Sequence, residues 1–193
     1  MALTFCLNGC EIMNKSLIIG VMGGGNASSK DTNAAYRLGG LIAEQGWILL
    51  NGGRNAGIMD ASAKGAKDHG GLTVGILPDD NPARASEYID IPVITGMGSA
   101  RNCINVLTSH IVVACPGGAG TLSEIALALK FNKVVILMDF DVGKLFESYI
   151  KPNIKPNIKQ GALVYTKTPE EVIAYCKKLH IQKEGVLRNF DVF

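Results

Sequence analysis

Short apolar runs alternate along the chain with longer segments of helical periodicity, and this alternation restricts the fold more than any other feature of the sequence. Apolar runs of about four to eight residues are typical of buried strands, whereas amphipathic segments of about ten or more are typical of helices. A repeated strand–helix unit forms parallel sheets with right-handed crossovers. The sequence therefore predicts an α/β fold, a doubly wound, mostly parallel sheet with helices on both faces. The predicted strands are residues 17–22, 47–50, 72–77, 91–94, 111–115, 134–138 and 163–165.

Helical segments separate these strands. The first helix ends at Gly46, because a glycine just beyond a periodic segment is a helix stop signal. Pro92 indicates an edge strand or a strand start, since proline has no N–H group to donate to a neighbouring strand. We expect one ligand-binding domain over residues 15–180, an N-terminal extension over 1–14 and a C-terminal tail over 181–193. The remaining predicted helices are residues 56–69, 98–108, 120–131 and 169–179.

Composition favours a single globular domain and argues against several classes of partner. The chain has 193 residues, of which 47% are hydrophobic and 19% are charged, which suits one domain with a sizeable core. A formal net charge of +2 is too small to indicate nucleic-acid binding. The sequence has no apolar run near the roughly 18 residues of a membrane span, so no membrane partner is expected. Five scattered cysteines make a poor disulfide framework and indicate a reducing, cytoplasmic setting.

Three glycine-rich clusters follow predicted strands, at the edge where open parallel sheets hold their ligands. Glycine lets backbone N–H groups turn toward an anion, and the helix that follows adds the positive end of its dipole. Turns between strands and helices often use glycine, but clusters at three strand ends favour a phosphate-bearing, nucleotide-like ligand. The predicted ligand-binding residues are Gly23, Gly24, Gly25 and Asn26; Gly52, Gly53, Arg54 and Gly57; and Pro116, Gly117, Gly118, Gly120 and Thr121.

Other nucleotide-binding and catalytic patterns are missing from the sequence. The clusters lack both the Gly-Lys-Ser/Thr ending of a P-loop and the Gly-x-Gly-x-x-Gly of dinucleotide-binding proteins, and Asn51 stands where an acidic ribose ligand is expected. Ser99 lacks the flanking glycines of a hydrolase nucleophile. For Asp79 and Asp80 we expect a solvated turn rather than a metal site. His110, beside a buried strand, is expected to be structural, and the histidine spacing predicts no metal site.

Two arginines lie close to the ends of predicted strands. Arg101 follows Gly98 and Ser99 at the start of a predicted helix, where a guanidinium can bind phosphate through two parallel hydrogen bonds. The alternatives for Arg101 are a solvated surface charge or a salt bridge across a subunit interface. We expect Gly98, Ser99 and Arg101 to contact the ligand. Arg54 offers the same chemistry from a more mobile setting inside the second cluster.

Glu124 allows two interpretations. Thr121 and Glu124 have the spacing of a capping box, with Thr121 as the N-cap and Glu124 at the third helical position. Thr168 and Glu171 have the same spacing without a glycine cluster before them, so we favour helix capping for Glu124. In the second interpretation, Glu124 is a carboxylate that faces the ligand and orients a ribose or acts as an acid or base.

Several of these residues together resemble a known superfamily. The sequence Gly52-Gly53-(x)3-Gly57-Ile58-Met59, the arginine at 101 and the motif Pro116-Gly117-Gly118-Ala119-Gly120-Thr121-(x)2-Glu124 are similar to the Rossmann-like proteins once mislabelled as lysine decarboxylases. That superfamily includes the cytokinin-activating phosphoribohydrolases, which cleave the N-glycosidic bond of nucleoside 5′-monophosphates. The resemblance implies that Arg101 and Glu124 match catalytic positions, and that the glycine clusters with Met59 hold phosphate and ribose.

The molybdenum cofactor carrier proteins, a branch of this superfamily, are more similar still. The resemblance covers about residues 15–180 and includes Gly46-Trp47-Ile48-Leu49-Leu50 and Gly96-Met97-Gly98-Ser99-Ala100-Arg101-Asn102. It implies a homo-oligomer, a dimer or tetramer, that holds molybdenum cofactor (molybdopterin) by its phosphate end and protects it from oxidation. The motif that ends at Glu124 nevertheless keeps the enzyme-like pattern.

The leading hypothesis is therefore a binding protein for a phosphate-bearing pterin or nucleotide. Such a protein retains its ligand and does not convert it into a product. The competing hypothesis is a phosphoribohydrolase in which Glu124 assists departure of the base through an oxocarbenium-like transition state. DNA processing is a third option, because distant Rossmann-like proteins handle single-stranded DNA, but the nearly neutral charge argues against it.

Overall fold

The computed structural model describes residues 16–142 and 162–188, with side chains described as far as residue 180. The expected N-terminal extension, residues 1–14, lies outside the described residues, and so does the chain after residue 188.

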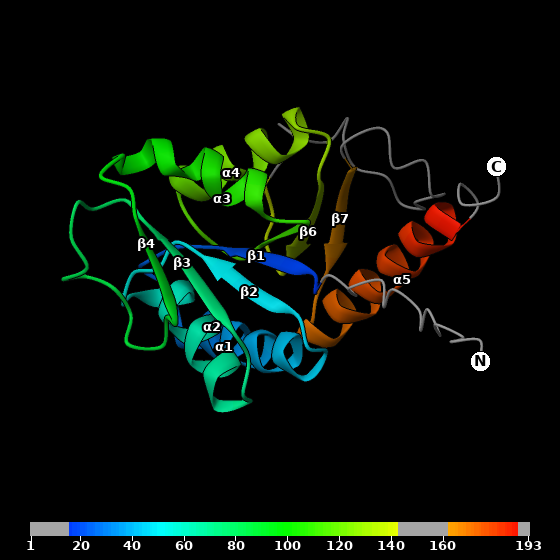
Figure 1. Ribbon diagram of the computed structural model, residues 1–193, viewed down its shortest axis with the longest axis horizontal. Helices are drawn as coiled ribbons and strands as arrows, with labels where there is room; N and C mark the ends of the chain where they lie inside the picture. Colours follow the sequence, from blue (N-terminus) through cyan, green and yellow to red (C-terminus); the bar gives the residue numbers. More distant parts are fainter. Residues whose placement is uncertain (1–15, 143–161, 189–193) are drawn as a thin grey trace, which may run out of the picture.

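Seven parallel strands form the central sheet, in the order β4-β3-β2-β1-β5-β6-β7 (Figure 1). The chain builds outward from β1 in one direction, then returns to the other side of β1 with β5. This arrangement is the doubly wound sheet that the alternating pattern predicts, and its order reverses between β1 and β5. The strands are β1 (Ile18–Met22), β2 (Ile48–Asn51), β3 (Thr73–Leu77), β4 (Ile91–Ile94), β5 (Ile111–Ala114), β6 (Val134–Met138) and β7 (Ala162–Thr166).

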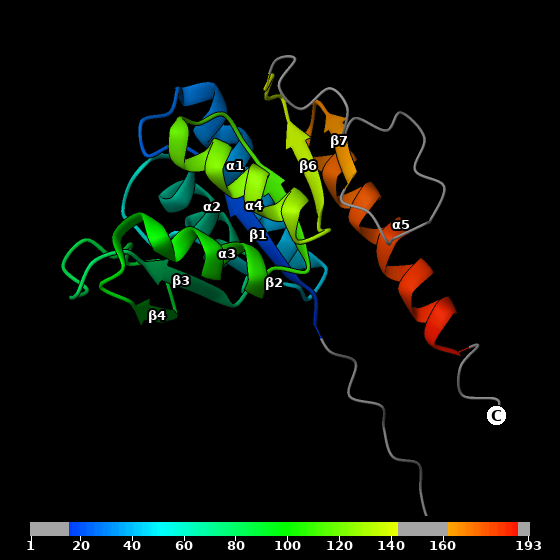
Figure 2. The ribbon, with the colours of Figure 1, turned by 90° about the horizontal axis from the view of Figure 1, so that it is seen from above.

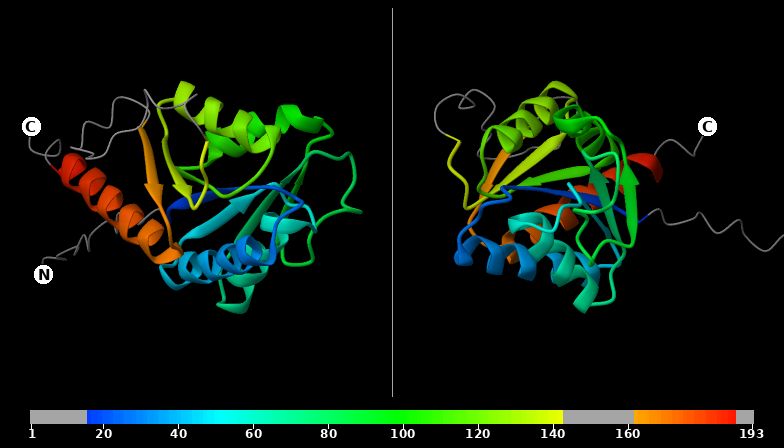
Figure 3. Two further views of the ribbon diagram at one scale, coloured as in Figure 1. Left: turned by 180° about the vertical axis from the view of Figure 1, so that it is seen from behind. Right: turned by 90° about the vertical axis from the view of Figure 1, so that its left-hand side faces the viewer.

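Helices cover both faces of the sheet, as Figures 1 and 2 show. Helices α1, α2 and α5 lie on one face, and α3 and α4 lie on the other. Figure 3 shows the same two layers from behind and from the side. The helical elements are α1 (Ser29–Glu44), α2 (Gly57–Asp68), the 3-10 turn η1 (Gly98–Arg101), α3 (Asn102–Thr108), α4 (Ala119–Lys130) and α5 (Pro169–Arg188).

The core consists of two apolar layers, one on each side of the sheet. Because side chains alternate along a strand, neighbouring residues such as Val112 and Val113 in β5 enter different layers. Val113 packs in the layer with Leu38 of α1, whereas Val112 packs in the layer with Ile125 of α4. Apart from β4, the strands are largely buried on both faces, which explains why they read as continuous apolar runs.

Strand β4 lies at one edge of the sheet, as Pro92 predicts. All four of its residues are exposed, and among the strands that the structure describes it pairs only with β3. The exposed apolar side chains include Ile91 (47%), Val93 (37%) and Ile94 (40%). This edge therefore carries apolar surface that the described part of the chain does not cover.

Two helix boundaries differ from the prediction. Helix α5 continues to Arg188, past the expected end near Leu179, because residues such as Gln182 and Lys183 are good helix formers despite their lack of apolar periodicity. Helix α4 begins at Ala119, whereas a capping box at Thr121 requires a start just after that residue, and this difference changes the interpretation of Glu124.

Candidate functional site

The three glycine clusters converge at the carboxyl edge of the sheet. They follow β1, β2 and β5, which are neighbours in the order β2-β1-β5. The Gly24 N–H group donates to the Pro116 carbonyl at 3.0 Å, and the Ile58 N–H group donates to the Gly24 carbonyl at 3.0 Å. The first glycine loop thus contacts both others at the point where the strand order reverses, which is the usual ligand position in such sheets.

The loops can approach each other this closely because glycine has no side chain. A Cβ atom added to Gly57, whose φ is +51°, would lie 2.3 Å from the Gly24 carbonyl oxygen. A Cβ atom on Gly117 would lie 2.9 Å from the Gly24 nitrogen. Either contact is shorter than van der Waals distance, so a larger residue at these positions would push the loops apart.

The N-terminus of α4 faces open space beside these loops. Apart from their own chain neighbours, added Cβ atoms on Gly118 and Gly120 would meet no atom of the described residues within 4 Å. Gly118 is the N-cap of α4, and no side chain caps its first turn. The first N–H groups of a helix need partners outside the helix and carry its positive partial charge. An uncapped, exposed N-terminus next to glycine loops is therefore suited to an anion such as phosphate.

Asn51 fixes the conformation of the second glycine loop. Its Oδ1 atom accepts a hydrogen bond from the Gly53 N–H group at 2.8 Å. Its Nδ2 group donates to the Met59 carbonyl at 2.8 Å and to the Ser62 hydroxyl at 3.1 Å. Asn51 is fully buried, so this position serves to order the loop. The sequence pattern indicates that Asn51 follows a strand, but its hydrogen-bond partners could not be predicted from it.

Arg101 lies against the second glycine loop. A Cβ atom added to Gly52 would come within 2.3 Å of Arg101 Nη1, so the guanidinium occupies the volume that a side chain there would fill. Nη1 donates to the Ile76 carbonyl at 2.9 Å. The Nε atom is buried and has no acceptor among the described residues. Arg101 is consequently a partly buried group of the site, and the alternative of a solvated surface charge is wrong.

Charges of opposite sign surround the Arg101 guanidinium. Burial lowers the pKa of Arg101, the carboxylates of Glu124 and Asp79 act to raise it, and Arg54 acts to lower it. These four side chains therefore share one electrostatic environment at the edge of the sheet.

Glu124 does not cap α4, and the capping prediction is wrong. Because Gly118 is the N-cap, Thr121 occupies the third helical position and Glu124 lies in the second turn. The glycine loop enters the helix earlier than Thr121, and Thr121 is buried with its side chain close to Gly117. The same spacing at Thr168 does form a cap, since Thr168 Oγ1 accepts from the Glu171 N–H group at 3.2 Å.

Glu124 is instead a buried carboxylate, 6% exposed. Its Oε1 atom accepts a hydrogen bond from Asn105 Nδ2 at 2.7 Å. Burial raises the pKa of Glu124, while the Asn105 hydrogen bond and the charge of Arg101 act against this increase. Glu124 and Arg101 form no ion pair within 4.0 Å. The two charges nevertheless attract each other at longer range, and each affects the pKa of the other.

Replacing Glu124 with glutamine is expected to make stability less sensitive to pH. With its folded pKa above the ordinary 4.5, Glu124 favours the folded state at low pH, and this contribution is lost as pH rises through the raised pKa. Relative to the native chain, Glu124→Gln is therefore expected to gain stability between pH 4 and pH 8. Urea unfolding at both pH values measures this change, with the exposed Glu87→Gln as control. An equal difference at both pH values would contradict the assigned burial.

Two asparagines of α3 hydrogen-bond to α4, one of them to Glu124, and neither was recognised from the sequence. Asn105 is fully buried and donates to Glu124, and Asn102 Nδ2 donates to the Ser123 hydroxyl at 2.8 Å. Their spacing of three residues places both on the face of α3 that packs against α4. That spacing is a signal in the sequence, but its meaning depends on how α3 and α4 pair.

Asp79 is not a solvated residue, which corrects the expectation for this turn. Its side chain is 12% exposed and pairs with Arg54 and Arg84. The hydrogen bond from Arg54 is the main cause that lowers the pKa of Asp79. Arg54 is therefore held by an ion pair, contrary to the expected mobile setting. Among the described residues, no cluster of three or more histidine, cysteine or acidic side chains is arranged to hold a metal ion.

The remaining predicted residues occupy different parts of the site. Gly25 and Asn26 are exposed in the first loop, and Gly98 and Ser99 are exposed in η1. Met59 is buried, and its sulfur would lie 2.6 Å from a Cβ atom added to Gly52. The structure thus places Met59 beneath the second loop as a packing residue.

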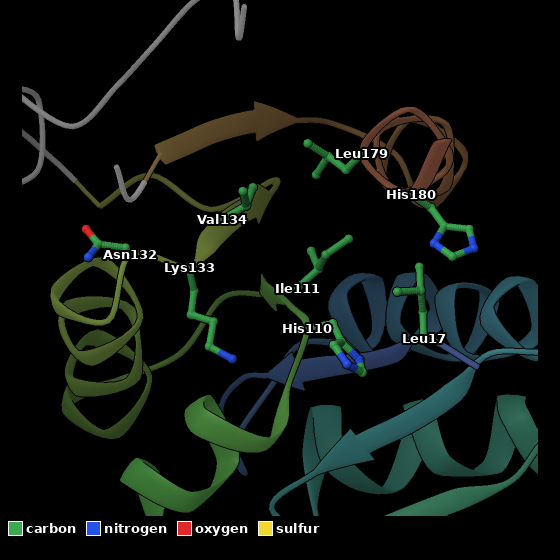
Figure 4. A pocket seen from close by; sticks show the side chains of 8 residues that line it. All are labelled: Leu17, His110, Ile111, Asn132, Lys133, Val134, Leu179 and His180. Carbon is green, nitrogen blue, oxygen red and sulfur yellow. The ribbon is translucent and has the colours of Figure 1, made fainter. Parts of the chain in front are cut away.

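A separate cavity of about 250 Å³ lies at the opposite, amino edge of the sheet (Figure 4). One of its residues, His110, accepts the Ile18 N–H group at Nδ1, 2.8 Å away, in agreement with its expected structural role. The cavity contains none of the residues predicted to bind ligand. Its lining residues are Leu17, His110, Ile111, Asn132, Lys133, Val134, Leu179 and His180.

Cysteines of the described residues are unpaired. Cys115 and Cys176 are buried, and burial raises the pKa of each thiol to about 12. Both therefore act as small apolar core groups. In the part of the chain that the structure describes, the helices are all too short or too polar to cross a membrane.

Comparison with known proteins agrees with this geometry. The molybdenum cofactor binding protein of Rippkaea orientalis is 46% identical, with a TM-score of 0.77 over 86% of this chain and 98% of that protein. The molybdenum cofactor carrier protein of Chlamydomonas reinhardtii is 38% identical, with a TM-score of 0.75 over 86% of this chain and 99% of that protein. A cytokinin riboside 5′-monophosphate phosphoribohydrolase of Mycobacterium marinum is 34% identical over 93 residues, covering 47% of this chain and 50% of that protein.

The family assignment rests on a match to most of the chain. Residues 16–173 match the SLOG cluster4 family, a span that includes all three glycine loops, Arg101 and Glu124. The chain therefore belongs to the SLOG cluster4 family and has the Rossmann-like fold of the molybdenum cofactor carrier proteins.

Proposed function

We propose that this protein binds a phosphate-bearing pterin or nucleotide and acts as a carrier of molybdenum cofactor. The observation that carries this proposal is the convergence of three glycine loops on the uncapped N-terminus of α4. Two similar structures, at 46% and 38% identity, are described as binding or carrying this cofactor. Molybdenum cofactor is cargo in this proposal, and the protein's contribution is to bind and shield it.

The residues of the site fit the phosphate end of such a ligand. Backbone N–H groups around Gly118 and Gly120 offer donors where an added side chain would meet no protein atom. Arg101 offers a positive charge and a buried Nε donor without an acceptor among the described residues. Charge-assisted hydrogen bonds from arginine and from a helix N-terminus are the common means of holding phosphate. The predicted ligand contacts of Asn26, Gly98 and Ser99 belong to this proposal as well.

One observation favours a second candidate function, a nucleoside 5′-monophosphate phosphoribohydrolase. Glu124 is buried, and burial raises its pKa, a direction that favours a carboxyl group carrying a proton. In this candidate, Glu124 donates that proton to the departing base as positive charge develops on the ribose, and Arg101 holds the phosphate. Free base released from AMP, and lost in Glu124→Gln, is the result that supports it. The matching relative shares only about half its length with this chain.

We also propose that the chain forms a homo-oligomer, a dimer or tetramer, in the cytoplasm. Five exposed apolar residues on and after β4 and on α3 support an interface, because stable interfaces bury about 800 Å² per partner around apolar centres. The unpaired cysteines agree with a reducing compartment. The five residues are Ile91, Val93, Ile94, Met97 and Leu107.

Replacing Gly120 with alanine tests the proposed position of the phosphate. Alanine favours a helix over glycine by up to about 1 kcal/mol, and its methyl group would meet no protein atom within 4 Å. We therefore expect unchanged or higher stability but about tenfold weaker AMP binding, because the methyl group would occupy the space of the phosphate. Thermal unfolding and calorimetric titration measure the two effects. Unchanged affinity would place the phosphate elsewhere.

A further inference from the structure

A cluster of charge adjoins the second glycine loop. The Asp79 carboxylate, beyond the end of β3, accepts hydrogen bonds from Arg54 Nε and Nη2 at 3.3 and 3.2 Å. It also accepts a hydrogen bond from Arg84 Nη2. Two guanidinium groups therefore share one carboxylate, and this cluster keeps one positive charge in excess.

The backbone holds Arg84 next to Arg54. The Asn55 N–H group donates to the Arg84 carbonyl at 3.0 Å, and the Ser86 N–H group donates to the Gly53 carbonyl at 2.8 Å. Arg54 and Ala85 also form an isolated antiparallel bridge. The segment that carries Arg84 is consequently docked on the second glycine loop, whose first residue, Gly52, contacts Arg101.

The two arginines keep donors that Asp79 does not use. A guanidinium has five N–H groups. Among the described residues, the Arg84 side chain donates only through Nη2, and the Arg54 side chain donates through Nε and Nη2. The Arg84 side chain is 61% exposed and that of Arg54 is 34% exposed, whereas Asp79 is 12% exposed. The buried carboxylate thus orients two arginines whose outer parts are accessible.

We propose that Arg54 and Arg84 form a second anion subsite, and that the preferred ligand carries two linked anionic groups, as a diphosphate does. The inference rests on the proposed function, in which the glycine loops and Arg101 hold a first phosphate. A nucleoside diphosphate has the required chemistry. Planar guanidinium groups suit such a subsite because they bind phosphate oxygens in pairs.

The test compares AMP with ADP on the full-length protein by calorimetric titration at one fixed salt concentration. We expect ADP to bind about tenfold more tightly than AMP, an advantage typical of one added charge-assisted contact. Arg84→Gln is expected to remove most of this advantage, and Arg84→Lys is expected to restore part of it. Arg37→Gln is the matched control, because Arg37 is an exposed arginine that pairs with Glu170 on α5.

The outcomes separate this inference from the proposed function. An advantage of ADP that disappears in Arg84→Gln and persists in Arg37→Gln supports the second subsite. AMP binding that depends on Arg101, but with no advantage for ADP, overturns the second subsite and leaves the proposed function standing. An advantage that survives Arg84→Gln also overturns it. A protein that binds neither nucleotide overturns both the subsite and nucleotide binding by the glycine loops.

Discussion

Arg101→Gln is expected to weaken AMP binding roughly 10- to 150-fold, because hydrogen bonds to charged groups contribute about 1.5–3 kcal/mol. Arg101 is partly buried beside Gly52, where the positive charge is poorly screened by solvent. Glutamine keeps hydrogen-bonding capacity near the Ile76 carbonyl but removes the charge. Calorimetric titration of the folded variant measures the loss, with near-ultraviolet circular dichroism to confirm its packing.

Two further variants make the Arg101 result interpretable. Arg101→Lys keeps the charge but loses the planar pair of donors, so we expect it to recover only part of the affinity. Arg37→Gln removes an arginine that is half exposed on α1 and should leave the affinity within twofold of the native chain. Equal affinity in the native chain and Arg101→Gln would exclude Arg101 from the ligand site.

Gly52→Ala is expected to reduce affinity about as much as Arg101→Gln while the fold survives. The added Cβ atom would lie 2.3 Å from Arg101 Nη1 and 2.6 Å from the Met59 sulfur. Both atoms are near the ends of flexible side chains, so they can move at a modest cost of about 1–3 kcal/mol. Movement of Arg101 would, however, take its charge out of position. Titration with AMP and urea unfolding together measure affinity and stability.

A double variant shows whether Gly52 acts through Arg101. If the two residues form one unit, Gly52→Ala combined with Arg101→Gln should bind no more weakly than Arg101→Gln alone. Additive losses would instead mean that the added methyl group blocks the ligand directly. Gly40→Ala is the matched control, because the atoms nearest to its added Cβ atom belong to the His69 ring, at 2.8 Å, away from the glycine loops.

The fold could be predicted from local sequence because all the strands except β4 are largely buried on both faces. Such strands read as short apolar runs, and glycine or proline closes many of them. Pro92 even indicates which strand lies at the edge. The end of α5 was missed because its last turns carry no apolar pattern, and helix propensity alone is a weak guide.

The site was predicted less completely, because its polar groups depend on contacts across the sheet. The glycine loops could be recognised since they follow three strands that a doubly wound sheet makes neighbours. Glu124 was named as a possible site carboxylate, but helix capping was favoured for it, and the start of α4 at Ala119 makes it a buried carboxylate instead of part of a capping box. Asp79 and Arg84 form an ion pair between two side chains of a polar turn. A segment without periodicity contains no sequence pattern from which this pair could be predicted.

The central claim is that the protein binds and retains molybdenum cofactor and does not hydrolyse nucleotides. One paired measurement tests this claim most directly. The purified full-length protein is titrated with molybdenum cofactor, and cofactor survival in air is followed. The same preparation is incubated with AMP and with an isopentenyl-type adenosine monophosphate, and free base is followed by chromatography. We predict that the cofactor is bound and protected and that no base is released. Base release that disappears in Glu124→Gln would contradict the carrier function and identify a phosphoribohydrolase.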